Sequence, residues 1–266
     1  MTNNDEELLI NPESPNNKDI VNIALFGIDT RDTDYDGSRT DTIMIVSLDN
    51  EHKKIKLSSI MRDTYVDIPG KKMDKINHAY AYGGPELSIK TINQNFDMNI
   101  KEYITVNFVA LEKIIDAIGG INIELKQEEL SQITGNPSVG SQNLTGKQAV
   151  DYARIRYIGN ADYERTQRQR RVMQEIIAKL QSERSLPKLI ELMNIVLPFT
   201  ETSFTQNELV SLGTQMIAAG KRPVEETRLP LSDHAKGQMI GGVYYLVPET
   251  LEDNVEHLHE FIYEKK

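Results

Sequence analysis

The chain has 266 residues, of which 39% are hydrophobic and 26% are charged, a composition typical of a folded globular protein. Forty acidic and thirty basic side chains give a net charge of −10, which disfavours general binding to nucleic acid because the field repels phosphate groups. Because the chain contains no cysteine, disulfides, thiolate nucleophiles and cysteine zinc sites are excluded. No apolar run has the length of a membrane-spanning helix.

Strand and helix patterns follow a polar leader, residues 1–19, whose Asn, Asp, Glu and Pro content predicts a flexible leader or stem. The double glycines 83–84 and 119–120 are expected to end helices, and Thr145 is expected to cap one. In chain order, the patterns predict strands at 21–28, 42–48 and 55–60, helices at 74–82 and 85–96, a strand at 103–107, a helix at 108–118, a strand at 121–125, a loop at 131–143, helices at 145–154, 163–183, 187–197 and 206–219, strands at 226–231 and 239–247, and a helix at 248–263.

Strands recur at both ends of the chain, and no linker rich in Pro, Gly or Ser divides it. We therefore expect one α/β domain over residues 20–266, layered α/β/α, with a central mixed β-sheet flanked by helices.

Arginine is concentrated in one window. Six of the twelve arginines lie between residues 151 and 171, where the local net charge is +3. On the expected helix from residue 163, Arg165, Arg168 and Gln169 share one face in the first turns. Guanidinium groups match phosphate oxygens, and a helix N-terminus favours an anion, so the pattern predicts an anion site. A solvated basic face paired with neighbouring acids is the alternative.

An acidic loop joins the first two expected strands. Asp29 follows the first strand and Asp41 precedes the second, so the two carboxylates approach each other if the strands are neighbours. Two carboxylates beside a substrate phosphate commonly bind Mg²⁺. Arg31 and Arg39 lie in the same loop. A surface loop in which the aspartates only form Asx-turns is the alternative.

Arg62 follows the third expected strand, a position where loops often carry function, although a structural contact with Asp63 explains it equally well. The five histidines show no spacing that predicts a metal site. Motifs of serine hydrolases, P-loop enzymes and dinucleotide-binding proteins are not found in the sequence.

Eight ordered motifs fall within about residues 20–180. They are ALFGIDTR at 24–31, RTDT at 39–42, SSIMRDT at 58–64, KINHAY at 75–80 followed by Gly83-Gly84, IGGI at 118–121, LTG at 144–146, YARIR at 152–156, and DYER at 162–165 continuing to Arg168-Gln169. In this order they resemble the LytR-CpsA-Psr family of Gram-positive cell-envelope proteins. Glu164 stands where the family pattern usually has Gly. Residues 185–266 carry no motif and are expected to complete the α/β domain.

The resemblance implies a phosphotransferase that moves an anionic glycopolymer, such as wall teichoic acid or capsule, from undecaprenyl pyrophosphate to peptidoglycan through a phosphodiester link. It also implies a place on the extracellular face of the cytoplasmic membrane, with an N-terminal transmembrane anchor that is absent from this chain and no nucleic acid partner. Two alternatives stay open. One is a non-catalytic regulator that binds polyprenyl phosphates, and the other is a pyrophosphate hydrolase.

Carried onto this sequence, the resemblance and the residue chemistry together imply that Asp29 and Asp41 bind Mg²⁺, or Mn²⁺ in its place. Asp29, Asp41, Arg62 and Arg165 are the expected catalytic residues, and either aspartate is a candidate base for the attacking sugar hydroxyl. The side chains expected to hold the pyrophosphate oxygens are Arg39, Arg62, Arg156, Arg165 and Gln169, with Arg31 and Arg168 as second choices.

Overall fold

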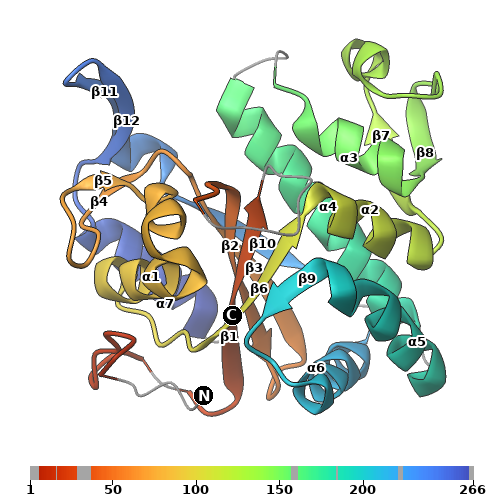
Figure 1. Cartoon of the computed structure of the whole chain (residues 1–266), viewed down its shortest axis with the longest axis horizontal. Coiled ribbons are helices and arrows are strands. Elements are labelled where there is room, and N and C mark those ends of the chain that lie inside the picture. Colours follow the sequence, from red (N-terminus) through yellow and green to blue (C-terminus); the bar gives the residue numbers. More distant parts are fainter. Residues whose placement is uncertain are drawn as a thin grey trace. The chain divides into compact units, whose positions relative to one another are not determined.

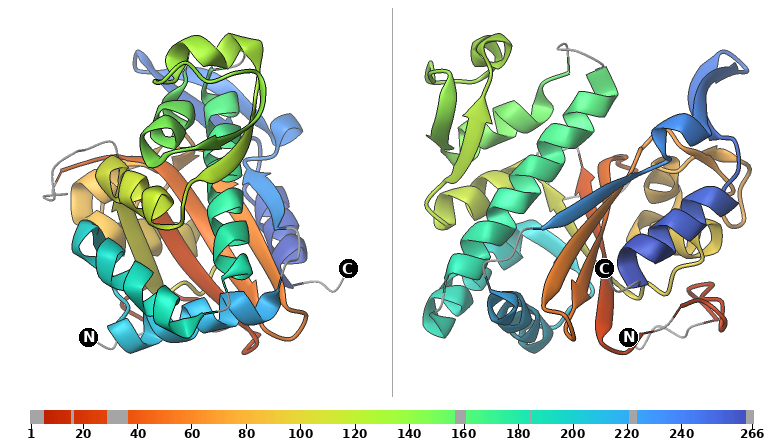
Figure 2. Two further views of the ribbon diagram at one scale, coloured as in Figure 1. Left: turned by 90° about the vertical axis from the view of Figure 1, so that its right-hand side faces the viewer. Right: turned by 180° about the vertical axis from the view of Figure 1, so that it is seen from behind.

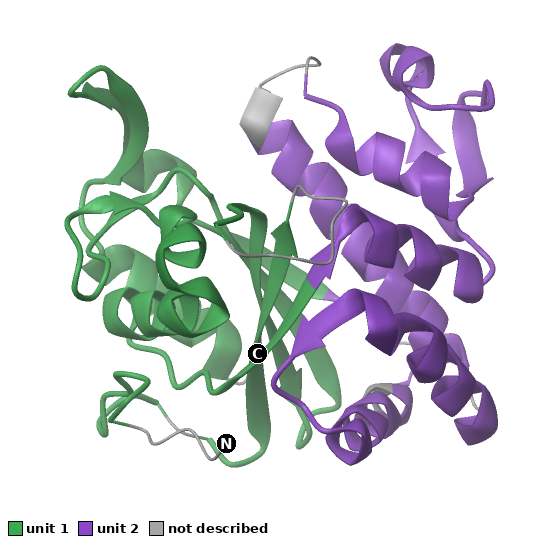
Figure 3. Ribbon diagram, in the orientation of Figure 1, with its two compact units in different colours: residues 1–105, 225–266 green, residues 106–224 purple. Residues whose placement is uncertain are grey.

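The computed structural model describes residues 6–15, 17–28, 37–156, 161–183, 185–220 and 224–263. Its contacts divide the chain into two compact units (Figure 3). Unit 1 contains residues 1–105 and 225–266, and unit 2 contains residues 106–224. Unit 1 is therefore built from two separate stretches of sequence. Within the described ranges, no helix is both long enough and apolar enough to cross a membrane.

The sheet of unit 1 has the strand order β10-β3-β2-β1-β6 (Figure 1). β1 and β2 are antiparallel, as are β2 and β3, whereas β10 is parallel to β3. The mixed sheet and its flanking helices confirm the predicted α/β fold class. The strand bounds are β1 Ile20–Ile28, β2 Thr40–Asp49, β3 Lys54–Ile60, β6 Glu102–Asn107 and β10 Glu225–Leu229.

Two helices, α1 (His78–Phe96) and α7 (Glu252–Tyr263), lie side by side against one face of this sheet (Figures 1 and 2). The core between helices and sheet contains the fully buried side chains of Phe26, Ile92 and Leu258. α1 has non-helical backbone angles at Gly83 and Gly84, so the predicted break between two helical segments is confirmed.

The predicted flexible leader is in part packed on unit 1. Leu8 is fully buried in the core, and its carbonyl accepts a hydrogen bond from the Asn93 side chain. The Ser14 hydroxyl donates to Asp97. Burial of an apolar side chain and two hydrogen bonds hold this segment, so the prediction of flexibility does not apply to residues 6–15.

Two small hairpins of unit 1 depart from the expected pattern. β4 (Tyr65–Val66) pairs with β5 (Asp74–Lys75), so the helix expected from residue 74 begins only at His78. β11 (Ala235–Ile240) and β12 (Val243–Pro248) form a hairpin where a single strand was expected over 239–247. Gly241 and Gly242 form its turn, and both have the positive φ that such a two-residue hairpin loop requires.

Unit 2 consists mainly of helices around a second core, with a small hairpin. Thr145 caps α3 as expected, since its hydroxyl accepts the backbone N–H of Gln148. The bounds are α2 Phe108–Ala117, β7 Ile121–Leu125, β8 Gly140–Leu144, α3 Gly146–Arg154, α4 Ala161–Ser182, α5 Leu186–Val196, β9 Thr200–Thr202 and α6 Gln206–Ala219.

The prediction of a loop over residues 131–143 is wrong for its last residues, which belong to β8 and pair antiparallel with β7. Gly, Ser, Gln and Asn dominate β8 and have low strand propensity, so the partner strand decides the conformation. The core of unit 2 includes Ile121, Leu144 and Tyr152, all fully buried.

Among the glycines of unit 2 that the structure describes, Gly146 leaves the least space for a side chain. A Cβ at this position would lie 2.2 Å from the carbonyl oxygen of Glu112 on α2. Gly146→Ala should therefore lower the free energy of unfolding by about 1–3 kcal/mol, because backbone must move to relieve the overlap. Chemical denaturation measures this change.

The matched control is Lys147→Ala at the next position. Lys147 is exposed and pairs with Asp151, so its replacement should cost only about 0–1 kcal/mol. Equal unfolding midpoints for the two variants would show that α3 and α2 are not packed as described.

Candidate functional site

The candidate site lies at one end of the unit 1 sheet. β1 and β2 are antiparallel neighbours, with Ile28 opposite Thr40, so the end of β1 meets the start of β2, where Asp41 lies. This is the arrangement on which the predicted approach of Asp29 to Asp41 depends. Asp29 and Arg31 themselves lie outside the described residues.

Arg62 and Asp41 form an ion pair, with 2.5 Å between Arg62 Nη1 and Asp41 Oδ1. β3 runs antiparallel to β2 on its other side, and Arg62 follows the end of β3, which brings it to Asp41. Both side chains are largely buried, so water screens their attraction less than at an open surface. The structure thus unites two of the predicted site residues.

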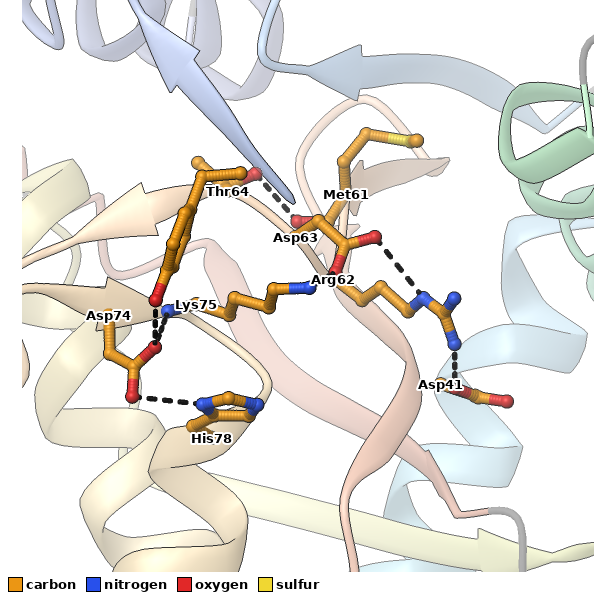
Figure 4. A network of polar contacts seen from close by, with 9 residues as sticks. Asp41, Met61, Arg62, Asp63, Thr64, Asp74, Lys75 and His78 are labelled. Atoms are coloured by element: carbon orange, nitrogen blue, oxygen red, sulfur yellow. Dashed lines mark hydrogen bonds and ion pairs between the residues drawn. The ribbon is translucent and has the colours of Figure 1, made fainter. Parts of the chain in front are cut away.

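The alternating charges continue beyond this pair (Figure 4). The Arg62 Nε atom lies 3.5 Å from Asp63 Oδ2, and the Lys75 ammonium donates to Asp63 Oδ1 at 2.7 Å. The local contact between Arg62 and Asp63 that the sequence suggested is therefore present, together with the longer-range pair to Asp41. The result is a chain of charges, Asp41, Arg62, Asp63 and Lys75, that fixes the position of the guanidinium.

Asp74 is the centre of a second polar cluster that the sequence did not reveal. Its carboxylate accepts hydrogen bonds from His78 Nδ1 at 2.9 Å, from the Tyr82 hydroxyl at 2.7 Å, and from the Tyr245 hydroxyl at 3.3 Å. The backbone N–H of Lys75 adds a fourth at 2.8 Å. Burial raises the pKa of Asp74, but the hydrogen bonds from His78, Tyr82 and Lys75 outweigh it and bring the pKa below its ordinary value. Asp74 is therefore an ionised acceptor.

Backbone hydrogen bonds connect this cluster to Arg62. The N–H of Ile76 donates to the carbonyl of Thr64 at 2.8 Å, and the N–H of Asn77 donates to the carbonyl of Arg62 at 3.2 Å. The segment from Asp74 to His78 therefore runs alongside residues 62–64. The Asp74 cluster and the Arg62 pair belong to one region of unit 1.

Arg39 is exposed and directly precedes β2, at the same end of this strand as Asp41. The hydrogen bond to Asp74 raises the pKa of the Tyr82 hydroxyl, and burial adds to this, whereas the positive charge of Arg39 opposes it. Arg39 and Arg62, both predicted phosphate ligands, thus belong to the same end of the antiparallel pair β2–β3.

Among the residues that the structure describes, no group of three or more His, Asp or Glu side chains could hold a metal ion. One of the two predicted ligands, Asp41, is described, at the start of β2. A metal site built from Asp41 therefore needs oxygen atoms from elsewhere, either from the segment that includes Asp29 or from a substrate phosphate.

Unit 2, taken by itself, carries the predicted arginines of α4. Arg165 is only 2% exposed and Arg168 only 3%, so the alternative of a solvated basic face is wrong for both. Arg168 donates to Glu129 at 2.8 Å, to Glu164 at 2.9 Å and to the carbonyl of Ile155 at 3.4 Å. All three guanidinium nitrogens are used, which gives Arg168 a structural role. Arg156 and Gln169 are half-buried.

The fold and these networks define an α/β protein in which an arginine is fixed against carboxylates at the end of two inner sheet strands, β2 and β3. The chain belongs to the LytR_cpsA_psr family, whose model matches residues 2–259. The resemblance inferred from the eight motifs is thereby confirmed.

Named relatives agree with this assignment. The chain is 36% identical over 244 residues to the polyisoprenyl-teichoic acid–peptidoglycan teichoic acid transferase TagU of Oceanobacillus iheyensis, covering 89% of this chain and 74% of the relative. It is 35% identical over 198 residues to the regulatory protein MsrR of Staphylococcus aureus, covering 74% and 61%. Among solved structures, the family protein YwtF (TagT) with bound octaprenyl pyrophosphate lipid has a TM-score of 0.72 at 26% identity, covering 92% and 91%.

The buried pair of Arg168 and Glu129 should stabilise unit 2. Glu129→Gln leaves the buried Arg168 charge with only the partly exposed Glu164 as its ionic partner, so we expect the free energy of unfolding to fall by up to about 3–5 kcal/mol. Chemical denaturation tests this, and exposed Glu128→Gln is the control. A Glu129→Gln variant as stable as this control would contradict the structural role of Arg168.

Asp74 should contribute to acid stability. Because its folded pKa lies below 3.8, its contribution is fully present above that pH and is lost as the pH falls through the folded pKa. Asp74→Asn should therefore flatten the dependence of unfolding free energy on pH between about pH 5 and pH 2. Exposed Asp67→Asn serves as the control, and a slope unchanged from wild type in Asp74→Asn would refute the expectation.

Proposed function

We propose that the protein transfers an anionic glycopolymer from polyprenyl pyrophosphate to a peptidoglycan sugar hydroxyl, forming a phosphodiester. The relative named TagU, a teichoic acid transferase acting on peptidoglycan, supports this reaction. The related structure that holds an octaprenyl pyrophosphate lipid supports the lipid carrier. The observation that carries the proposal in this chain is the ion pair between Arg62 and Asp41 at one end of the sheet.

Arg62 suits the binding of a pyrophosphate. Its charge is permanent, and its side chain is fixed by carboxylates on two sides before substrate arrives. Cleavage of a pyrophosphate places negative charge on the departing lipid phosphate, and a fixed guanidinium stabilises that charge without reorganisation. In unit 1, exposed Arg39 supplies a second cation.

Unit 2 offers further candidates by itself. We propose Arg165 as a catalytic residue there, with Arg156 and Gln169 as phosphate-binding side chains on and before α4. Arg165 and Gln169 are the fifth and ninth residues of α4 and share one face of its N-terminal half. Arg168 is left out because Glu129, Glu164 and a backbone carbonyl already occupy it.

The proposed metal is Mg²⁺, or Mn²⁺ in its place, with Asp41 and Asp29 as its protein ligands. Asp41 is a hard oxygen donor beside a predicted phosphate site, and this chemistry fits either ion. When bound, the ion would neutralise charge on the pyrophosphate oxygens. The protein side chains hold and orient the substrate around it.

The proposed location is the extracellular face of the cytoplasmic membrane of a Gram-positive bacterium, with an N-terminal membrane anchor. The name of the TagU relative contains teichoic acid and peptidoglycan, and these polymers belong to the cell envelope. This supports a location at the envelope. The lipid carrier supports a place next to the membrane.

A second function is favoured by one observation, the similarity to the regulatory protein MsrR. A regulator that only binds polyprenyl phosphate would use the same arginines but needs no metal. Hydrolysis of the pyrophosphate, with water as acceptor, is a further outcome of the test. The products distinguish all three functions.

The test incubates the purified chain with Mg²⁺, a polyprenyl-pyrophosphate saccharide and soluble peptidoglycan oligomers, and mass spectrometry identifies the products. We expect polyprenyl monophosphate together with saccharide phosphate joined to the oligomer. Asp41→Asn and Arg62→Lys should each lower the rate by about 10²-fold or more, because fixed charges at the reacting phosphate are lost. Removal of metal with EDTA should stop the reaction.

Arg154→Ala is the matched control, because Arg154 lies in the same basic window but is exposed and stacks on the Phe108 ring. Its rate should equal that of wild type. Free saccharide phosphate as the sole product would favour hydrolysis. If the lipid donor binds but is not converted, and neither EDTA nor Asp41→Asn changes this binding, the result would favour the regulator and exclude the transferase.

A further inference from the structure

His78 and Asp74 form a pair whose geometry resembles that of a catalytic base and its orienting carboxylate. His78 is the first residue of α1, and its Nδ1 lies 2.9 Å from Asp74 Oδ2. An ionised carboxylate only accepts hydrogen bonds, so Nδ1 must carry the proton. In the neutral ring, Nε2 then has the lone pair and is the basic nitrogen. Asp74 therefore fixes the tautomer that a general base needs.

Asp74 is held rigidly enough for this purpose. Besides His78, it accepts hydrogen bonds from Tyr82, from Tyr245 of the β12 hairpin, and from the backbone of Lys75. Tyr65 packs edge-on against Tyr245, with 4.8 Å between ring centroids. Three partners close in sequence and one distant partner, Tyr245, thus fix the carboxylate, and through it the imidazole.

The second nitrogen of His78 is turned away from Asp74 (Figure 4). Figure 4 shows the imidazole with Nδ1 towards Asp74 and the other nitrogen turned to the side on which Arg62 and Asp41 lie. The next residue back, Asn77, donates its N–H to the carbonyl of Arg62. The side chain of His78 is 20% exposed, so a substrate hydroxyl can reach it.

The surroundings of His78 suit a sugar. The Tyr82 ring is 47% exposed and lies edge-on to the imidazole, with 5.9 Å between centroids. An exposed aromatic face next to hydrogen-bonding groups offers both the apolar and the polar contact that a pyranose ring presents. The carboxylates near Arg62 are less suited as bases, because Asp41 is bound to a guanidinium and Asp63 lies between two cations.

We propose that His78 is the general base of the transfer reaction and that Asp74 is its positioning residue, at a subsite for the acceptor sugar formed with Tyr82. This inference rests on the proposed function. His78 Nε2 takes the proton of the acceptor hydroxyl as that oxygen forms a bond to the phosphorus on the saccharide side of the pyrophosphate. The bond from this phosphorus to the bridging oxygen breaks, and polyprenyl monophosphate leaves with the electron pair. The imidazolium then returns its proton to solvent.

Several titratable and charged groups belong to the elements around the imidazole. On its own helix lies Tyr82, and the Lys71 ammonium stands 5.7 Å from the centre of that ring. The groups from neighbouring elements are Asp74 and Lys75 of β5, Tyr65 of β4, Tyr245 of β12, Arg39 before β2, and Arg62 and Asp63 after β3.

The decisive variant is His78→Asn. The Asn amide can still donate to Asp74, as Nδ1 does, but it has no basic nitrogen. With the transfer assay above, we expect kcat to fall by about 10²- to 10⁴-fold, while the KM of the lipid donor stays within about threefold. The acidic limb of the pH profile of kcat should disappear. Asp74→Asn removes the carboxylate that fixes the tautomer of His78, so it should also lower kcat. Added imidazole should partly restore the activity of His78→Ala.

His52→Asn is the matched control. His52 pairs with Asp49 at 2.8 Å in the same way, but at the opposite end of β2 from Asp41. Its kinetics should equal those of wild type. Binding of octaprenyl pyrophosphate, measured by calorimetry without acceptor, should be unchanged in His78→Asn and weakened in Arg62→Lys.

The outcomes separate the inference from the proposed function. A wild-type chain that forms no transfer product overturns both. If wild type is active and His78→Asn keeps its rate and pH profile, His78 is not the base and the proposed function stands. If His78→Asn loses lipid binding as well as turnover, His78 binds the donor and the role of base is refuted.

Discussion

The guanidinium of Arg62 is the point on which the candidate site depends. It binds Asp41 from β2 and lies against Asp63, whose other oxygen takes the Lys75 ammonium. Its own carbonyl accepts the N–H of Asn77, which places the start of α1 beside it. One cation and its backbone therefore fix three stretches of unit 1 relative to one another. Desolvating such a charge is costly, and paired carboxylates offset that cost before any substrate binds.

The fold was predictable where local signals agree with the pattern of apolar residues. Gly83-Gly84 breaks α1 and Thr145 caps α3, as expected, because both effects are local. β8 and the β11–β12 hairpin were not predictable to the same degree. The polar residues of β8 become a strand only through pairing with β7. The turn at residues 241–242 lies within an apolar stretch that predicted one continuous strand.

The residues of the candidate site also differ in how far they could be predicted from the sequence. Arg62 and Asp41 could be chosen from sequence, because each stands at a strand end and the register of two antiparallel pairs brings them together. The Asp74 cluster could not be. Its nearest signal is a histidine four residues after an aspartate, which is common on surfaces, and its decisive partner Tyr245 is distant in sequence. Likewise, sequence spacing could not separate Arg165 from the structurally engaged Arg168.

Unit 1 has a consequence for how the chain reaches its native state. Its strand β10 pairs with β3, and α7 packs on β10 and α1, so the last fifth of the sequence completes a sheet begun by the first. Unit 2 is continuous and has all of its residues available earlier during synthesis. The N-terminal strands must therefore wait, with an open edge at β3, until the C-terminus emerges. Such non-local pairing slows folding and leaves that edge exposed to wrong partners in the meantime.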